Sequence, residues 1–368
     1  MNAALLTRVV DLAVAIQQIP APTFAEAQRA AFLRLLFEQQ GLSDVIMDEL
    51  GNVVGRIPGM GLQPPLVVTA HTDTVFPAST DLRLQRQVER IYGPGIGDNS
   101  LGVAGLIGLT WALQEQKITL PGDLWLAANV GEEGLGNLCG MRRVVDRFGE
   151  RALAYIILEG MALGQVYHRG LGVQRYRITA HTAGGHSWVD FGHPSAIHEL
   201  TGLVTRLTAI PLPKHPRTSL NVGLIGGGTS VNTIAAEAWL ELDLRSESER
   251  ALLALHQQVD ALARGAEREG VRVSIEPIGD RPVGKIAASH SLVRLVKRCL
   301  ETHGIKPSLS IGSTDANLPL SRGLPAVCLG LTTGGGAHTL QEYINTAPLQ
   351  NGLSCLVDIV RGVFQELA

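Results

Sequence analysis

Residues 66–75 read LVVTAHTDTV, an apolar and β-branched run that leads directly into a histidine and an aspartate. The segment 66–70 is typical of a strand buried on both faces, because no polar residue alternates with the apolar ones. The segments 124–130 and 154–158 have the same character, and a helical segment over 101–113 lies between the first two runs. Strands alternating with helices predict an α/β fold, with a mixed, mainly parallel sheet and helices on both faces.

Candidate metal ligands follow each of these three strands, at the edge where an open α/β sheet binds its ligands. His71 and Asp73 share a face of an extended chain, so Asp73 could hold the second ring nitrogen of a metal-binding His71. A hydrogen-bonded core histidine beside a surface aspartate explains this pair equally well. Glu132 and Glu133 come after the second strand, where one could be a ligand and the other a general base. Glu159 ends the third strand and needs a partner or a metal there.

Two further candidates lie in glycine-rich segments. Asp98 belongs to GPGIGDN at residues 93–99, and His338 follows the glycines of GGGAHT at residues 334–339. Taken singly, Asp98 fits a turn or a helix cap as well. Together, two imidazoles and several carboxylates form a donor set that suits zinc, cobalt or manganese.

Composition excludes several classes of function. The 368 residues carry a formal net charge of −3 with both signs spread along the chain, so we expect neither a nucleic-acid partner nor a membrane partner. The four cysteines include no Cys-x-x-Cys pair, which disfavours a disulfide framework or a thiolate metal site. Without a signal-peptide pattern or a long apolar run, we expect a cytoplasmic protein.

Near the N-terminus the sequence predicts two helices. The first should end before Pro20, because proline cannot continue a helix. Thr23 and Glu26, three residues apart, form a capping-box pattern and predict a second helix that runs to about Gln40.

A second domain interrupts the α/β pattern. From about residue 167 the predicted elements follow the order β-α-β-β-α-β, the split arrangement of a ferredoxin-like sandwich. These elements are expected at residues 173–180, 194–209, 219–224, 236–244, 248–269 and 271–278. The α/β pattern then resumes, so we predict a main domain of residues 1–166 and 284–368 with an insertion of residues 167–283.

The ordered motifs HTDTV, GPGIGDN, GEEG (residues 131–134), Glu159 and GGGAHT resemble the di-zinc aminoacylase and carboxypeptidase superfamily. Its members include glutamate carboxypeptidase, acetylornithine deacetylase, succinyl-diaminopimelate desuccinylase, aminoacylase and peptidase T. The resemblance covers essentially the whole chain. It implies that the inserted domain is a lid and a dimerisation domain, and that the protein forms a homodimer through it.

The resemblance also implies a site for two divalent metal ions. Asp98 would bridge them, His71 and Glu159 would complete one metal site, and Glu133 and His338 would complete the other. Zinc is the expected metal, although the same donors suit cobalt and manganese.

Catalytic and substrate-binding roles follow from the same resemblance. Glu132 would be the general base on the water that bridges the metals, and Asp73 would orient His71. From the lid, His186 would stabilise the tetrahedral oxyanion in the neighbouring subunit's active site, although it could also be a turn histidine. Asn232 and Arg245 match substrate-contacting positions. Arg245 could clamp a carboxylate, or form a plain surface salt bridge instead.

Within the superfamily, Glu159 favours carboxypeptidase or aminoacylase specificity, and Arg245 suits a substrate with a free carboxylate. We therefore expect hydrolysis of an amide bond in a short peptide or N-acyl amino acid. Residues 185–198 and 312–317 also resemble peptidase T-like chains, so a tripeptide aminopeptidase is the alternative. A non-catalytic protein that binds amino-acid derivatives is a remote one, because the sequence lacks no expected ligand.

Overall fold

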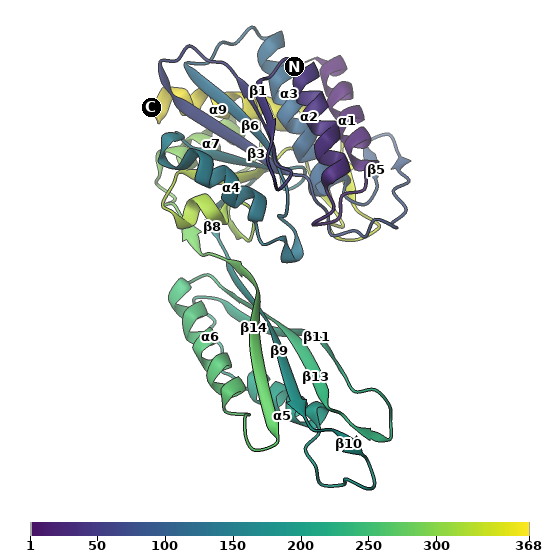
Figure 1. The fold of residues 1–368 in the computed structure, drawn as a ribbon. Helices are drawn as coiled ribbons and strands as arrows, with labels where there is room; N and C mark the ends of the chain where they lie inside the picture. Colours follow the sequence, from purple (N-terminus) through teal and green to yellow (C-terminus); the bar gives the residue numbers. More distant parts are fainter. Residues whose placement is uncertain (1, 368) are drawn as a thin grey trace. The chain divides into compact units, whose positions relative to one another are not determined.

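The computed structural model describes residues 2–367 and divides into two compact units. The main unit comprises Met1–Gly170 and Gly284–Ala368, and the insertion unit comprises Leu171–Val283. Figure 1 shows the course of the chain through both of them. No helix in the described part of the chain is long and apolar enough to cross a membrane.

A nine-stranded mixed sheet forms the centre of the main unit. Its neighbouring strands, in spatial order, are β1 (Ser43–Met47), β2 (Val53–Ile57), β6 (Gly122–Asn129), β3 (Gln63–His71), β7 (Tyr155–Glu159), β17 (Ala326–Gly330), β8 (Gln165–Gly170) and β15 (Gly284–Lys285), with β16 (Ser308–Gly312) also beside β8. The four strands β6, β3, β7 and β17 are parallel to one another. Their carboxyl ends therefore lie at one edge of the sheet.

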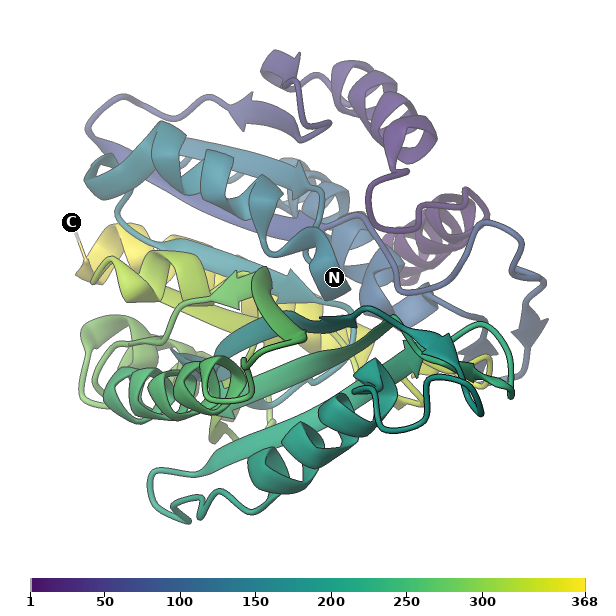
Figure 2. The ribbon, with the colours of Figure 1, turned by 60° about the horizontal axis from the view of Figure 1, so that its bottom comes forward.

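Helices cover both faces of this sheet, as Figure 2 shows. They are α1 (Ala3–Gln17), α2 (Ala27–Gln39), α3 (Leu101–Glu115), α4 (Cys139–Phe148), α7 (Ser291–Thr302), α8 (Asn317–Ser321) and α9 (Leu349–Glu366). Ile156, Ile157 and Leu158 of β7 are fully buried although their side chains alternate between the two faces. Such burial contributes about 1.5–3 kcal/mol for each large apolar side chain, and it holds the strand ends in place.

A small four-stranded sheet joins two loops that are far apart in the sequence. It contains β4 (Gln85–Arg86), β5 (Arg90–Tyr92), β18 (Gly334–Gly335) and β19 (Tyr343–Asn345). Because β5 pairs with β19, the loop after Tyr92 lies beside the loop that connects β18 to β19. These loops carry Asp98 and His338.

The insertion unit is a ferredoxin-like sandwich. Its elements are β9 (Gly172–Thr182), α5 (Ala196–Thr208), β11 (Thr218–Gly227), β13 (Glu237–Ser246), α6 (Glu249–Arg264) and β14 (Val271–Arg281), with the short strands β10 (Gly185–His186) and β12 (Thr233–Ile234) paired separately. The antiparallel sheet has the order β11-β13-β9-β14. Helices α5 and α6 pack on one face, where Ile178 and Leu240 are buried.

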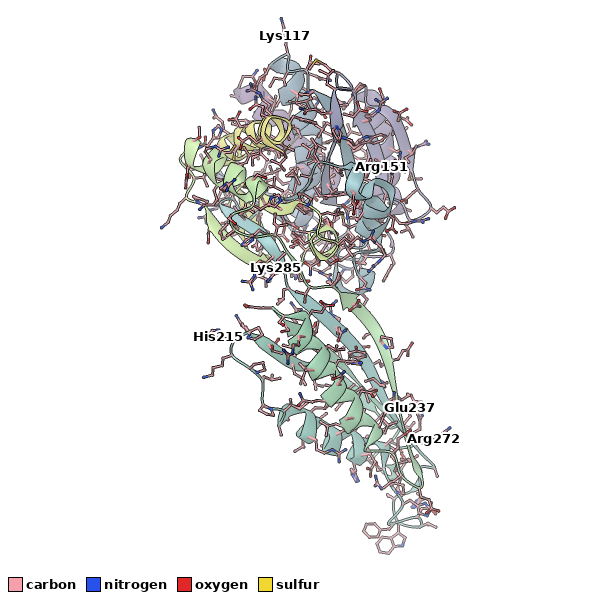
Figure 3. All side chains as sticks on the ribbon, turned by 90° about the vertical axis from the view of Figure 1, so that its left-hand side faces the viewer. Lys117, Arg151, His215, Glu237, Arg272 and Lys285 are labelled. Atoms are coloured by element: carbon pink, nitrogen blue, oxygen red, sulfur yellow. The ribbon has the colours of Figure 1, made fainter. Side chains whose placement is uncertain are left out.

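Polar side chains line the other face of the insertion sheet. His181 of β9 pairs with Glu237 of β13 on one side and with Arg272 of β14 on the other. Figure 3 labels Glu237 and Arg272, which mark one end of this sheet. The chain continues from this end into β10 and β12 and the loops beside them.

The predicted α/β class with a ferredoxin-like insertion is confirmed. The capping box is wrong, however: α2 begins at Ala27, and Glu26 makes no side-chain cap hydrogen bond. The side chain of Thr23 instead donates to Asp73, and that of Glu26 accepts from the backbone of Gly131. Both side chains therefore bind residues that follow strands β3 and β6 and do not cap the helix.

Candidate metal centre

Three of the candidate ligands take their positions from parallel strands. His71 is the last residue of β3 and pairs with Asn129, the last residue of β6. Glu133 follows β6 in the next loop, and Glu159 ends β7 on the other side of β3. The common direction of the strands brings all three side chains to one edge, as the sequence predicted.

Asp98 and His338 reach the same place from the loops joined by the small sheet. His71 Nε2 lies 3.2 Å from Asp98 Oδ1 and 3.6 Å from Glu159 Oε2. His338 Nε2 lies 3.1 Å from Asp98 Oδ2 and 3.3 Å from Glu133 Oε1. The five predicted ligands thus form two groups, and each group faces a different oxygen of Asp98.

These distances fit metal coordination. Two donors bound at about 2.0–2.1 Å to a tetrahedral zinc ion lie about 3.3 Å apart, close to the separations found here. His71, Asp98 and Glu133 also offer ligand atoms that all lie within 4.8 Å of one another. A carboxylate with one oxygen in each group is the arrangement expected of a bridging ligand, so the donor set fits two ions.

Asp73 orients the His71 ring through its Nδ1 atom. Its Nδ1 lies 3.1 Å from the backbone carbonyl of Asp73 and 3.5 Å from the Asp73 carboxylate. In the neutral ring Asp73 would hold a proton on Nδ1, and Nε2, which faces Asp98 and Glu159, would then be available to a metal ion. Metal-binding histidines require such a partner on the second ring nitrogen.

Asp73 is also the junction between two strand ends. Its carboxylate accepts the backbone N–H of Glu132 at 3.0 Å and that of Glu133 at 2.8 Å. The Thr23 hydroxyl donates to the same carboxylate at 2.9 Å. Burial raises the pKa of Asp73, but its bonds to His71 and to these N–H groups outweigh burial and lower it. A single buried carboxylate thus fixes both the His71 segment and the Glu132–Glu133 backbone.

The two histidines are held in strongly negative surroundings. Burial disfavours the charged form of His71, yet the carboxylates of Glu159 and Asp73 hold its pKa well above the usual value. Hydrogen bonds, first with Asp98, raise the pKa of His338 to about 10. This negative charge favours the protonated form of both rings. A bound metal ion would have to displace that proton, because only a neutral imidazole is a ligand.

Glu342 is a site residue that sequence reasoning missed. Its fully buried carboxylate accepts the backbone N–H groups of Gly97 at 2.7 Å, Asp98 at 2.8 Å and Gly95 at 3.0 Å. Burial, reinforced by the charge of Asp98, raises its pKa to about 7. Because Glu342 follows His338 by four residues, it connects the loop that carries His338 to the loop that carries Asp98. The only available signal was the glycine-rich segment 93–97, whose N–H groups need an acceptor.

Asp315 is a second buried carboxylate near the site to which the sequence assigned no role. It is fully buried, and its Oδ2 accepts from Asn129 Nδ2 at 2.7 Å at the end of β6. Burial raises the pKa of Glu159 to about 7, and the charges of Asp98 and Asp315 add to this effect. Asp315 lies in the segment 312–317, which resembled a family loop but suggested no chemical role.

The remaining candidates lie in the insertion unit. His186 of β10 pairs with Thr233 of β12, and Ser187 N donates to the backbone of Asn232 at 3.0 Å. His186 and Asn232 therefore occupy neighbouring loops at one end of this unit. His186 Nδ1 accepts from Trp188 N at 3.2 Å, so the neutral ring carries its proton on Nε2. The exposed ring is thus an N–H donor.

Arg245 lies elsewhere in the insertion unit. It is near the end of β13, and its Nε donates to Asp243 Oδ1 at 2.7 Å. Asp243 also accepts from Arg175 at 3.0 Å. The guanidinium is therefore part of an ion-pair row on the polar face of the sheet, which was one of the two interpretations of the sequence.

The chain matches Peptidase family M20/M25/M40 over residues 67–362. It is 26% identical over 334 residues to succinyl-diaminopimelate desuccinylase of Corynebacterium glutamicum, with 88% of each chain covered. A tripeptidase from Staphylococcus aureus has the same fold, with a TM-score of 0.82 and 22% identity over 98% of this chain and 99% of that one. A dinuclear metal binding peptidase of the M20 family from Bacillus subtilis has a TM-score of 0.72 and 17% identity. The match covers 99% of this chain and 100% of that one.

The family match extends from β3 through the insertion to α9, and so includes all five candidate ligands. On this basis the chain belongs to peptidase family M20/M25/M40, a family of metal-dependent hydrolases.

Proposed function

We propose that this protein hydrolyses the amide bond of a short peptide or an N-acyl amino acid with a free carboxylate, using two divalent metal ions. The observation that carries the proposal is Asp98. Its two oxygens face separate histidines, at 3.2 Å from His71 and 3.1 Å from His338. Glu159 and Glu133 complete the two donor groups, for which zinc is the preferred ion and cobalt or manganese are chemically suitable.

When bound, two such ions polarise a scissile carbonyl and lower the pKa of water. We assign the general base to Glu132, which is buried beside Glu133 and has its backbone fixed by Asp73. In this role Glu132 takes a proton from the attacking water and delivers it to the leaving amine. The more than half-exposed side chain of His338 marks the solvent-facing side of the site, where a substrate could enter.

The substrate contacts are assigned to the insertion unit. We propose that Arg245 exchanges part of its pairing with Asp243 for the carboxylate of the substrate, since guanidinium and carboxylate form two parallel hydrogen bonds. Asn232 and the Nε2–H of His186 would donate to the scissile carbonyl oxygen as negative charge develops on it.

The geometry of the insertion unit supports action between two copies of the chain. His186 and Asn232 lie beyond the Glu237 end of β13, whereas Arg245 lies near the other end. At about 3.3 Å per residue, Glu237 and Arg245 are about 26 Å apart along the strand. A dipeptide cannot span this length, so one substrate that touches both His186 and Arg245 needs them from different subunits.

We therefore propose a homodimer formed through the insertion unit, with His186 acting in the partner's site. β11 is an edge strand of its sheet, and Leu224 and Ile225 on it are exposed. Such an edge can pair with a second copy. Trp188 and Phe191, in the loop after His186, are 85% and 88% exposed, and contact with a partner would bury them.

Hydrolysis by the zinc- or cobalt-loaded protein is expected to be confined to substrates with a free carboxylate and to disappear with a chelator. The test is a panel of N-acetyl amino acids, dipeptides, tripeptides and C-terminally amidated tripeptides, with product release followed by chromatography. Cleavage of amidated tripeptides from the N-terminus would favour a tripeptide aminopeptidase instead. Hydrolysis that is unaffected by chelation would reject the metal mechanism.

Arg245→Ala is expected to raise KM about tenfold or more for free-carboxylate substrates, because a charge-assisted hydrogen bond contributes roughly 1.5–3 kcal/mol. The measurement is kcat and KM for each substrate and its amide. Arg177→Ala is the matched control, because Arg177 forms a similar ion pair with Glu241 on the same sheet. Equal effects on acid and amide would show that Arg245 is no carboxylate clamp.

Glu132→Ala should lower kcat by about 10²–10⁴-fold, the usual contribution of a positioned general base. Metal content, measured by atomic absorption, should be unchanged. Glu49→Ala removes a carboxylate that is 92% exposed and should alter neither quantity. Loss of metal from the Glu132 variant would make Glu132 a ligand and end its assignment as the base.

A heterodimer of a Glu132→Ala chain and a His186→Ala chain should regain activity. If His186 acts in the partner's site, one of the two sites is intact, and we expect about half of the wild-type rate for each dimer. The heterodimer is isolated with two different affinity tags and compared with both inactive homodimers. Activity no higher than that of the homodimers would show that His186 serves its own subunit.

A further inference from the structure

Arg29 is buried although nothing in the proposed mechanism uses it. Only 2% of its surface is exposed, and it belongs to the buried stripe of α2 together with Ala30, Leu33 and Phe37. Arginine is almost never fully buried unless it is paired, so its place among apolar residues requires a specific reason.

The guanidinium joins two backbone segments beside the metal centre. Its Nε and Nη2 donate to the carbonyl of Ile19 at 3.0 and 2.6 Å, and its Nη1 donates to the carbonyl of Thr72 at 2.7 Å. The two segments also contact each other directly, because Thr74 N donates to the carbonyl of Ala21 at 2.9 Å. Arg29 thus holds the segment before α2 against the segment after β3.

Thr72 is the residue between His71 and Asp73. Its N–H and hydroxyl both donate to the carbonyl of Asn129, at 2.7 and 3.0 Å, so its peptide is fixed to the end of β6. The carbonyl of Thr72 points the other way and is satisfied by Arg29. A displacement of this peptide would move the His71 ring and the Asp73 carboxylate together.

Arg29 also supplies charge. Burial lowers its pKa to about 10, while the charges of Asp73 and Glu26 oppose that change, so the group remains a cation at neutral pH. Glu26 lies one turn earlier on the same helix side and accepts the N–H of Gly131 at 3.2 Å. Arg29 of α2 thus contacts the segment after β3, and Glu26, which directly precedes α2, contacts the segment after β6.

We propose that Arg29 is a positioning residue of the metal centre, which fixes the Thr72 peptide and offsets the charge of Asp73 so that His71 keeps its geometry as a ligand. This inference rests on the proposed function, because it takes His71 as a metal ligand. Arg29 touches neither metal nor substrate and acts only through the His71–Asp73 segment.

The test uses the full chain with Arg29→Lys and Arg29→Met. Lysine keeps the charge but lacks the planar fork that reaches both carbonyls, and methionine removes the charge as well. We expect the affinity for cobalt, measured by isothermal titration, to fall about tenfold for lysine and further for methionine, as for other residues that support metal ligands. The visible absorption spectrum of the bound cobalt should also change, and kcat should fall while KM stays the same.

Arg56→Lys and Arg56→Met are the matched controls. Arg56 makes hydrogen bonds of 2.6 and 3.1 Å to Asp44 and Asp123 in the same unit, on β2 rather than at the strand ends. Its variants should change the melting temperature without altering cobalt affinity. If the Arg29 variants also lose only thermal stability, Arg29 is purely structural and the inference is wrong. If the wild-type protein itself binds no cobalt, the metal centre fails and the inference fails with it.

Discussion

The concentration of buried negative charge at one edge of the main sheet is the constraint on which the other features depend. Asp73, Glu133 and Glu159 lie within a few residues of the strand ends, and Asp98 meets them from the loop after β5. Glu342 accepts from the backbone of that loop, and Asp315 accepts from Asn129 at the end of β6. Carboxylates so close together cannot all remain ionised without compensation. This charge raises the pKa values of His71 and His338, and bound divalent cations would compensate it.

Backbone amides and one buried cation share the rest of the compensation. Three N–H groups of the loop before α3 bind Glu342, and two N–H groups after β6 bind Asp73. The first loop must pass close to its neighbours, and a Cβ on Gly97 would meet the Met161 side chain at 2.6 Å. Glycine at position 97 therefore permits the close approach of the Met161 and Ile344 side chains. Arg29 performs the same electrostatic task with a side chain, close to Asp73.

Sequence reasoning could place the candidate ligands that follow strands, because a buried strand and the residues after it are local features. His71, Glu133 and Glu159 could be assigned to one sheet edge for this reason. Thr23 and Glu26 were misassigned, since the spacing of a capping box is the same whether or not the side chains turn back to the helix. Glu342 and Arg29 act on backbone groups that are distant in sequence, so no local pattern marks them. His186 and Arg245 lie at opposite ends of β13, and this separation follows from how the strands of the insertion unit pair. No local sequence pattern predicts it.

The point of insertion isolates the main sheet from changes in the inserted unit. Gly170 at the end of β8 pairs with Gly284 at the start of β15, so the chain leaves and re-enters the main sheet at adjacent positions. A tight hairpin could in principle join these two residues, and whatever is inserted between them leaves the register of the main sheet unchanged. A change in the length or sequence of the insertion can therefore leave the strands that carry His71 and Glu159 in place.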